Sequence, residues 1–157
     1  MVQEKERAKT VLIVEDVEQD RLILYNILER QFKIQDVKDY KIYAVDRPDD
    51  ALEIAKNEKI GLLITDLNFN RAKRSMVFET SIKYVQELVK VCAGHGAGLI
   101  VTSDKGLDAK TEELLKKSGV EFVKKPIYTA DFVKRVVQSI KEPAFKPNLS
   151  ESALKHL

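Results

Sequence analysis

The stretch GLLITD, Gly61 to Asp66, suits a buried strand and ends on a carboxylate. A run that stays apolar over Leu62, Leu63 and Ile64, without alternating polar residues, predicts a strand covered on both faces. A carboxylate at the end of such a strand either caps a helix or takes part in chemistry. The role of Asp66 therefore depends on what the rest of the chain brings to the same place.

The composition of the 157 residues is that of one globular domain, with 44% hydrophobic and 33% charged residues. A net charge of +2 gives no overall attraction to nucleic acid or membranes, and we expect no direct DNA binding. The single Cys92 excludes an internal disulfide and is typical of a reducing compartment. The start MVQEKERAKT lacks the apolar core of a signal peptide, and no apolar run reaches membrane-spanning length. We expect a cytoplasmic protein.

Apolar runs with strand character alternate with stretches of helical periodicity. The other runs are VLIV, IYAV, LIVT and VEFV, at 11–14, 42–45, 99–102 and 120–123. Apolar residues at helical spacing separate them, and the clearest stripe follows the last strand, from Phe132 to Ile140. Five strands alternating with helices predict an α/β fold with a central parallel sheet.

The domain is predicted to span residues 10–141. Residues 1–9 are expected to be a flexible N-terminus, and residues 142–157 a C-terminal tail with a candidate short helix capped by Ser150. A loosely held end and a helix that docks on a partner are the two interpretations of this tail. It is too short to be a separate output domain.

Polar residues of different chemistry stand at the carboxyl ends of four predicted strands. Glu15 and Asp16 follow the first strand and Asp66 the third, while Thr102 closes the fourth and Lys125 follows the fifth. In an open parallel sheet these ends lie along one edge, where such folds bind ligands. Helix capping could explain any one of these residues, but it does not readily explain why all of them lie at the same edge of the sheet.

The chemistry of this set points to a phosphoryl group. Carboxylates brought together raise one another's pKa unless a cation lies among them, and few oxygen ligands favour Mg²⁺ with several waters over a caged Ca²⁺. Asp66 is then a candidate nucleophile. The metal, Lys125 and the Thr102 hydroxyl would take up charge on the phosphoryl oxygens.

The ordered motifs VLIVED, LLITD, LIVTSD and FVKKP resemble the receiver domain of two-component response regulators. The resemblance implies a flavodoxin-like three-layer sandwich with five parallel strands in the order 2-1-3-4-5 and helices on both faces. It also implies a stand-alone signalling module and not an enzyme. A sensor histidine kinase or phosphotransfer protein would phosphorylate it, and it would signal by binding partners.

The resemblance assigns the phosphoryl group to Asp66. Asp16 would bind Mg²⁺ directly and Glu15 through water, and the backbone carbonyl of Asn68 would complete the metal site together with Asp66.

The remaining family positions concern the response to phosphorylation. Thr102 and Ser103 would bind the phosphoryl group, and Lys125 would pair with it because the family places its lysine directly before the proline, here Pro126. The peptide bond before Pro126 is a candidate for the cis form. Phe122 matches the aromatic switch residue. The helix over 110–117, the strand over 120–123 and the last helix would form the face that changes partners, including a second copy in a homodimer.

One region departs from the family pattern. The loop over 67–80 carries Asn70-Arg71 where a Pro-Gly pair is usual, and it is extended before the next helix. A receiver-like scaffold that works without phosphorylation therefore stays open. A phosphohydrolase of the haloacid-dehalogenase type also uses a strand-terminal Asp, Mg²⁺ and Lys, but it needs a second acid at the position of Asn68. His95 and His156 offer no metal-binding spacing and are predicted to be surface residues.

Overall fold

Strands and helices alternate regularly in the computed structural model, which describes residues 8–67, 78–103, 106–125, 129–141, 149 and 154–155. In chain order the elements are β1 (Thr10–Val14), α1 (Glu18–Ile34), β2 (Lys41–Val45), α2 (Pro48–Asn57), β3 (Leu62–Asp66), α3 (Phe78–Gly94), β4 (Gly98–Ser103), α4 (Ala109–Lys117), β5 (Val120–Lys124) and α5 (Ala130–Lys141). The predicted order of strands and helices is confirmed. None of the helices in these residues is both long and apolar enough to cross a bilayer.

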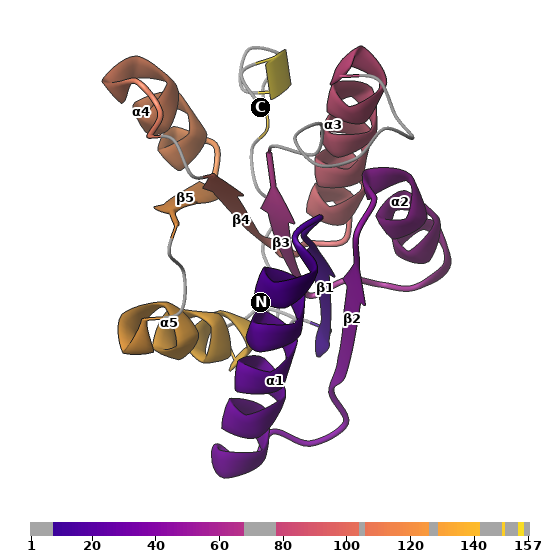
Figure 1. The fold of residues 1–157 in the computed structure, drawn as a ribbon, viewed down its shortest axis with the longest axis vertical. Coiled ribbons are helices and arrows are strands. Elements are labelled where there is room, and N and C mark those ends of the chain that lie inside the picture. Colours follow the sequence, from indigo (N-terminus) through magenta and orange to yellow (C-terminus); the bar gives the residue numbers. More distant parts are fainter. Residues whose placement is uncertain are drawn as a thin grey trace, which may run out of the picture.

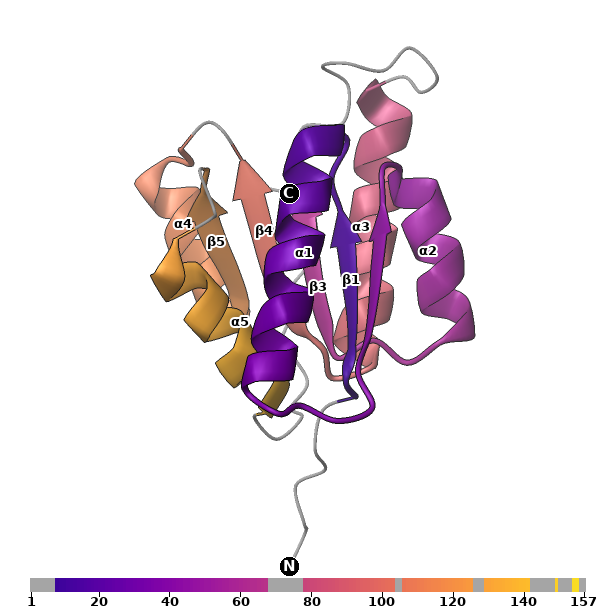
Figure 2. The same cartoon turned by 60° about the horizontal axis from the view of Figure 1, so that its bottom comes forward.

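The five strands form one parallel sheet in the order β2-β1-β3-β4-β5. This confirms the predicted α/β class and the 2-1-3-4-5 strand order. Because the strands are parallel, their arrowheads point to one end of the molecule, as Figure 2 shows. The strand order reverses between β1 and β3, and the crevice beyond the carboxyl ends at such a point is where open α/β sheets bind ligands.

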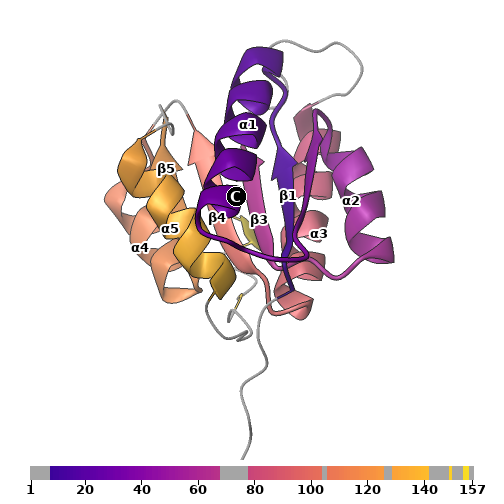
Figure 3. The same ribbon diagram turned by 90° about the horizontal axis from the view of Figure 1, so that it is seen from below.

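Two hydrophobic clusters cover the two faces of the sheet. Successive side chains of a strand point to opposite faces. In β1, Val11 and Ile13 pack with residues of α1 and α5, whereas Leu12 and Val14 pack with residues of α2, α3 and α4. Figures 1 and 3 show the resulting three layers, with α1 and α5 on one face and the other three helices opposite. A strand covered on both faces must be apolar on both, which explains the continuous runs in β1, β3 and β4.

The buried side of α5 is the side that carries its apolar residues. Phe132, Val133, Val136, Val137 and Ile140 of α5 are all buried, as their spacing predicts. The helix α4 begins where the Asp108 carboxylate accepts a hydrogen bond from the Thr111 amide at 2.7 Å.

The helix α4 ends at Ser118-Gly119. Ser118 is the C-cap, and Gly119 turns the chain into β5 with a φ of 83°. This φ favours glycine because it has no Cβ.

Candidate functional site

The acidic pair Glu15-Asp16 extends β1 past its last strand residue into the buried edge of the sheet. The Glu15 amide donates to the Val45 carbonyl at 3.0 Å, which continues the pairing with β2 by one residue. The Glu15 carboxylate accepts from the Val17 amide at 3.1 Å, and Arg21 donates to the Glu15 carbonyl at 2.9 Å. These bonds anchor the chain between β1 and α1, so both acids are held next to the end of β3.

Asp66 is the last residue of β3 and is completely buried. It lies in register with Thr102 of β4, and the Leu67 amide donates to the Thr102 carbonyl at 3.1 Å. The pairing with β4 therefore continues past the acid and fixes its backbone. A buried strand end supplies a rigid support for a reactive side chain.

Lys125 joins the carboxylates of two strands. Its Nζ lies 2.8 Å from Glu15 Oε2 and 2.8 Å from Asp66 Oδ2, and its side chain is only 9% exposed. The Lys125 amide donates to the Ser103 carbonyl at 2.9 Å, so the residue is held against the end of β4. Its neighbour Lys124 is exposed, because successive residues of an extended strand point in opposite directions.

Burial and pairing change the proton affinities of this group. Burial and the nearby Asp66 carboxylate raise the pKa of Glu15 to about 7, even though Lys125 acts in the opposite direction. Burial tends to lower the pKa of Lys125, but its hydrogen bonds to Asp66 and Glu15 outweigh this effect, and the net result is a raised pKa. The ammonium group of Lys125 is therefore charged at neutral pH, whereas the Glu15 carboxyl group exchanges its proton near pH 7.

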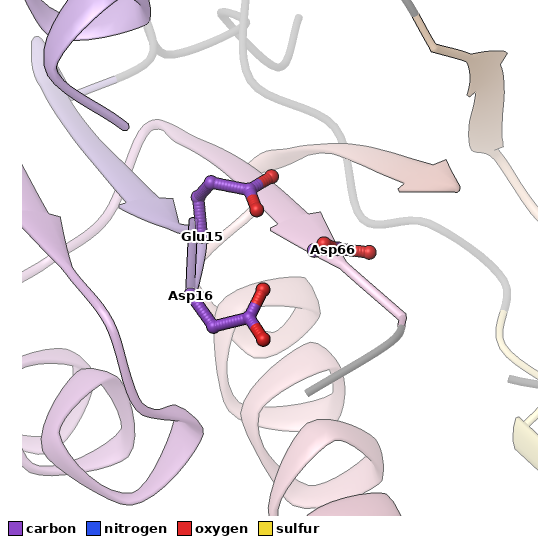
Figure 4. A group of neighbouring side chains, drawn as sticks. All are labelled: Glu15, Asp16 and Asp66. Atoms are coloured by element: carbon purple, nitrogen blue, oxygen red, sulfur yellow. The ribbon is translucent and has the colours of Figure 1, made fainter. Parts of the chain in front are cut away.

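Three carboxylates lie close enough to share one cation. Glu15, Asp16 and Asp66 are buried, and each offers an oxygen atom within 4.8 Å of the oxygens of the other two. Figure 4 shows Glu15 and Asp16 at the end of β1, with their carboxylates on the side toward Asp66. One lysine does not balance three acids, and carboxylate oxygens are the ligands that Mg²⁺ prefers. The donor set therefore fits a hard divalent cation.

The comparisons with known proteins agree with this architecture. No family model matches the sequence, and no curated protein matches it. Solved structures do match. A CheY-like response regulator receiver domain protein from Methanospirillum hungatei JF-1 aligns with a TM-score of 0.62 at 16% identity, over 85% of this chain and 94% of that chain. A response regulator from Thermotoga maritima gives a TM-score of 0.59 at 19% identity, over 86% and 99% of the two chains. The chemotaxis response regulator CheY4 of Vibrio cholerae gives 0.59 at 16%, over 85% and 98%.

The chain has the receiver fold. The resemblance noticed in the sequence is thus confirmed at the level of architecture. The carboxyl ends of the strands, where the acids gather, are at the switch point of this fold.

The other predicted site residues of this receiver fold lie at different distances from the acids. Thr102 and Ser103 are buried at the end of β4, and the Thr102 hydroxyl makes only a long contact of 3.5 Å to the Thr65 carbonyl. Phe122 of β5 is half-buried and packs against the cluster under α2, α3 and α4. Asn68, Pro126 and most of the extended loop over 67–80 lie outside the described residues.

Two contacts at the site were not predicted from the sequence. Arg21 reaches the Glu15 carbonyl from the first turn of α1, and Thr65 donates through its hydroxyl to the Asp66 carbonyl at 3.0 Å. Both bonds end on backbone oxygen atoms, which every residue carries. The residue types of Glu15 and Asp66 therefore gave no sign of these two hydrogen bonds.

Proposed function

We propose that this protein is a phospho-accepting receiver in which Asp66 carries the phosphoryl group. The observation that supports this most directly is the position of Lys125, whose ammonium group lies 2.8 Å from a carboxylate oxygen of Asp66. A buried carboxylate beside a fixed cation is an oxygen nucleophile whose product charge already has a partner. We assign the receiver domain to residues 10–141.

The proposed reaction is a phosphoryl transfer. A carboxylate oxygen of Asp66 attacks phosphorus and forms a new P–O bond, while the P–N bond to the donor histidine breaks. The imidazole nitrogen keeps the electron pair of that bond and takes a proton from solvent. The product is an acyl phosphate on Asp66, and with acetyl phosphate as donor the leaving group is acetate. Positioning and charge stabilisation supply most of the catalysis in such transfers.

The carboxylates also suit a resident Mg²⁺. Asp16 and Asp66 would hold it directly and Glu15 through water, and the backbone carbonyl of Asn68 is the further ligand that we propose. Bound Mg²⁺ would supply positive charge to the phosphoryl oxygens. The chain itself contributes burial, which excludes bulk water, and Lys125, which is fixed by two ion pairs.

Phosphorylation would be read out through β4 and β5. The long contact of the Thr102 hydroxyl holds it weakly, so a move toward a phosphoryl oxygen would cost little. Ser103 would offer a second polar contact beside it. Phe122 is half-buried, which would leave its aromatic side chain room to rotate. We propose α4, β5 and α5 as the face for a downstream protein or a second copy of the chain, and the peptide bond before Pro126 as cis.

The proposed partners follow from this chemistry. A sensor histidine kinase or a phosphotransfer protein would be the donor, and the protein would act by binding and not by substrate turnover. We propose a cytoplasmic location, since phosphoryl donors of this type act there, and no direct contact with DNA.

The first test is intact-mass analysis after incubation with acetyl phosphate and Mg²⁺. We expect one added phosphoryl group on the parent protein, and none without Mg²⁺ or in the Asp66→Asn variant. Asp131→Asn, at an exposed acid on α5, is the matched control and should be modified like the parent.

Absence of an adduct on the parent, together with no binding of beryllium fluoride, would contradict the proposal. The phosphorylation-independent scaffold would then be the better account of the fold. An adduct that persists in Asp66→Asn would place the modification at another residue and would equally contradict the assignment.

A further inference from the structure

Two leucines of the C-terminal segment pack on the sheet face opposite to α5. The helix α5 covers one face together with α1, and the described remainder of the segment is Leu149, Leu154 and Lys155. Leu149 and Leu154 pack against the other cluster, the one under α2, α3 and α4. The chain therefore passes from one face of the molecule to the other after α5 ends at Lys141.

The described end of the segment lies between α3 and α4 (Figure 1). Figure 1 shows its described end piece between these two helices, whereas α3 lies alongside α2. The Gln86 side chain of α3 donates to the Leu154 carbonyl at 2.9 Å. Charged α3 residues surround this contact, and a hollow of about 390 Å³ is lined by Leu154, Lys155 and the α3 residues Lys83, Gln86, Glu87 and Lys90.

Other half-buried side chains pack against the same cluster as the two leucines. Tyr84 of α3, Leu114 of α4 and Phe122 of β5 are half-buried side chains of the same cluster as the two leucines. Leu149 and Leu154 are themselves half-buried, unlike Leu88 and Leu115, which are completely buried. The two leucines thus pack on the outside of the cluster and do not form the centre of the core.

We propose that the surface between α3 and α4 is a docking site for a leucine-bearing segment, and that the chain's own Leu149 and Leu154 occupy it as a releasable cover. Two half-buried leucines and one side-chain hydrogen bond anchor the cover. Phe122, which belongs to the face proposed for signalling, packs against the same cluster as the two leucines. The inference does not depend on phosphorylation of Asp66.

Hydrogen exchange of the parent protein tests whether the cover is releasable. Contacts that open locally exchange their amides far faster than contacts that open only with the whole fold. We expect the amides of Leu154 and Lys155 to exchange at least a hundredfold faster than those of β1 and β3 but at least tenfold slower than in an unfolded peptide of the same sequence. Exchange as slow as in the central strands would make the segment part of the core. Exchange at the free-peptide rate would mean that it is not seated. Either result would overturn the proposal.

A peptide in trans tests the docking site itself. The full chain with Leu149→Ser and Leu154→Ser vacates the surface, and a fluorescent peptide of residues 146–157 is titrated onto it and onto the parent. We expect apparent binding at least tenfold tighter to the double variant, since a tethered segment competes at high effective concentration. A peptide with both leucines replaced by serine should not bind.

Controls keep the two tests decisive. Lys155→Ser changes an exposed neighbour and should leave exchange unchanged, whereas Gln86→Ala removes the donor to Leu154 and should speed exchange up to about tenfold. Glu87→Ala is the matched exposed control on α3. Equal peptide affinity for parent and double variant would overturn the proposal. Protection that rises with protein concentration would also overturn it, because the segment would then dock on a second copy.

Discussion

Where the strands stop, the sheet buries three carboxylates and one ammonium group; where they start, it buries backbone amides whose partners are neutral. At the first end, Glu15, Asp16 and Asp66 lie around Lys125. At the second end, the Gly61 amide donates to the Thr10 carbonyl at 2.8 Å. Among the described residues, only the first end buries charge, because at the second end the Lys41–Glu58 ion pair lies at the surface.

The neutral end is also closely packed. The Gly98 amide donates to the Gly61 carbonyl at 2.9 Å, and the Ile60 amide donates to His95 Nδ1 at 3.0 Å. Burying like charges costs free energy, whereas satisfying buried amides avoids a cost. The chain therefore concentrates destabilising charged groups at the carboxyl ends of its strands, where the chemistry is proposed, and stabilising contacts at the amino ends.

The largest effect is expected at the neutral end, from Gly61→Ala. A Cβ at Gly61 would lie 1.6 Å from the Ala8 carbonyl oxygen, so the backbone there would have to move. We expect a loss of about 3 kcal/mol in the free energy of unfolding, at the upper end of overpacking costs. Urea unfolding measures it.

The matched control is Gly94→Ala, at the last residue of α3, where a Cβ meets no atom within 4 Å. Alanine there should leave stability unchanged or raise it by up to about 1 kcal/mol. Parent-like stability of Gly61→Ala would show that the start of the sheet is not tightly closed by residue 8.

At the charged end, Asp16→Asn is expected to act in the opposite direction in metal-free protein. Removing one of three clustered carboxylates relieves repulsion, and a gain of about 1 kcal/mol in the free energy of unfolding is expected. Mg²⁺ should stabilise the parent by about 2.7 kcal/mol at a hundred times its dissociation constant, and the variant far less. Thermal unfolding with Mg²⁺ and with EDTA measures both effects.

Asp131→Asn, at the exposed acid on α5, should behave like the parent with and without Mg²⁺. A metal-free Asp16→Asn protein that is less stable than the parent would break the comparison, because the acids would then support the fold. Equal Mg²⁺ stabilisation of parent and variant would remove Asp16 from the metal site.

The smallest effect concerns pH at the neutral end. Burial and the nearby Lys59 lower the pKa of His95 below its usual 6.5, and its Nδ1 must be unprotonated to accept from the Ile60 amide. The unfolded chain therefore binds a proton more readily than the folded one as pH falls. The contribution of His95 to stability is complete above pH 6.5 and is lost as pH falls below it.

His95→Gln keeps an acceptor that does not titrate. Between pH 7.5 and 5.5 it should lose less stability than the parent, by an amount below about 1 kcal/mol, in paired urea unfolding series. His156→Gln serves as the control at the other histidine. Identical pH dependence of the parent and His95→Gln would show that the bond to Ile60 does not contribute.

The sequence predicted the fold more completely than it predicted the side-chain contacts. Continuous apolar runs such as Val11–Val14 favour strands covered on both faces, and their alternation with helical stretches indicated the α/β class. The prediction that His95 is a surface residue was only partly right, since its side chain is half-buried and accepts a backbone hydrogen bond. No local pattern indicates that bond, because its donor is a main-chain amide 35 positions away.

The same limit applies to the C-terminal leucines. The sequence predicts a short helix capped by Ser150, but only the folded chain shows that Leu149 and Leu154 pack on the face opposite to α5. The cover depends on Gln86, which is 68 positions from Leu154. Hydrophobic periodicity tells which side of a helix is buried, and it does not tell what the helix is buried against.

By itself the sequence determined the order of strands and helices and placed acids, hydroxyl and amine at strand ends, because backbone period and burial are local properties. Only the tertiary structure decided that Lys125 reaches Asp66, 59 positions away, and Glu15 at the same time. That meeting depends on the crossover order of the sheet and on the direction of each side chain where its strand ends. Both are set by the packing of the whole domain.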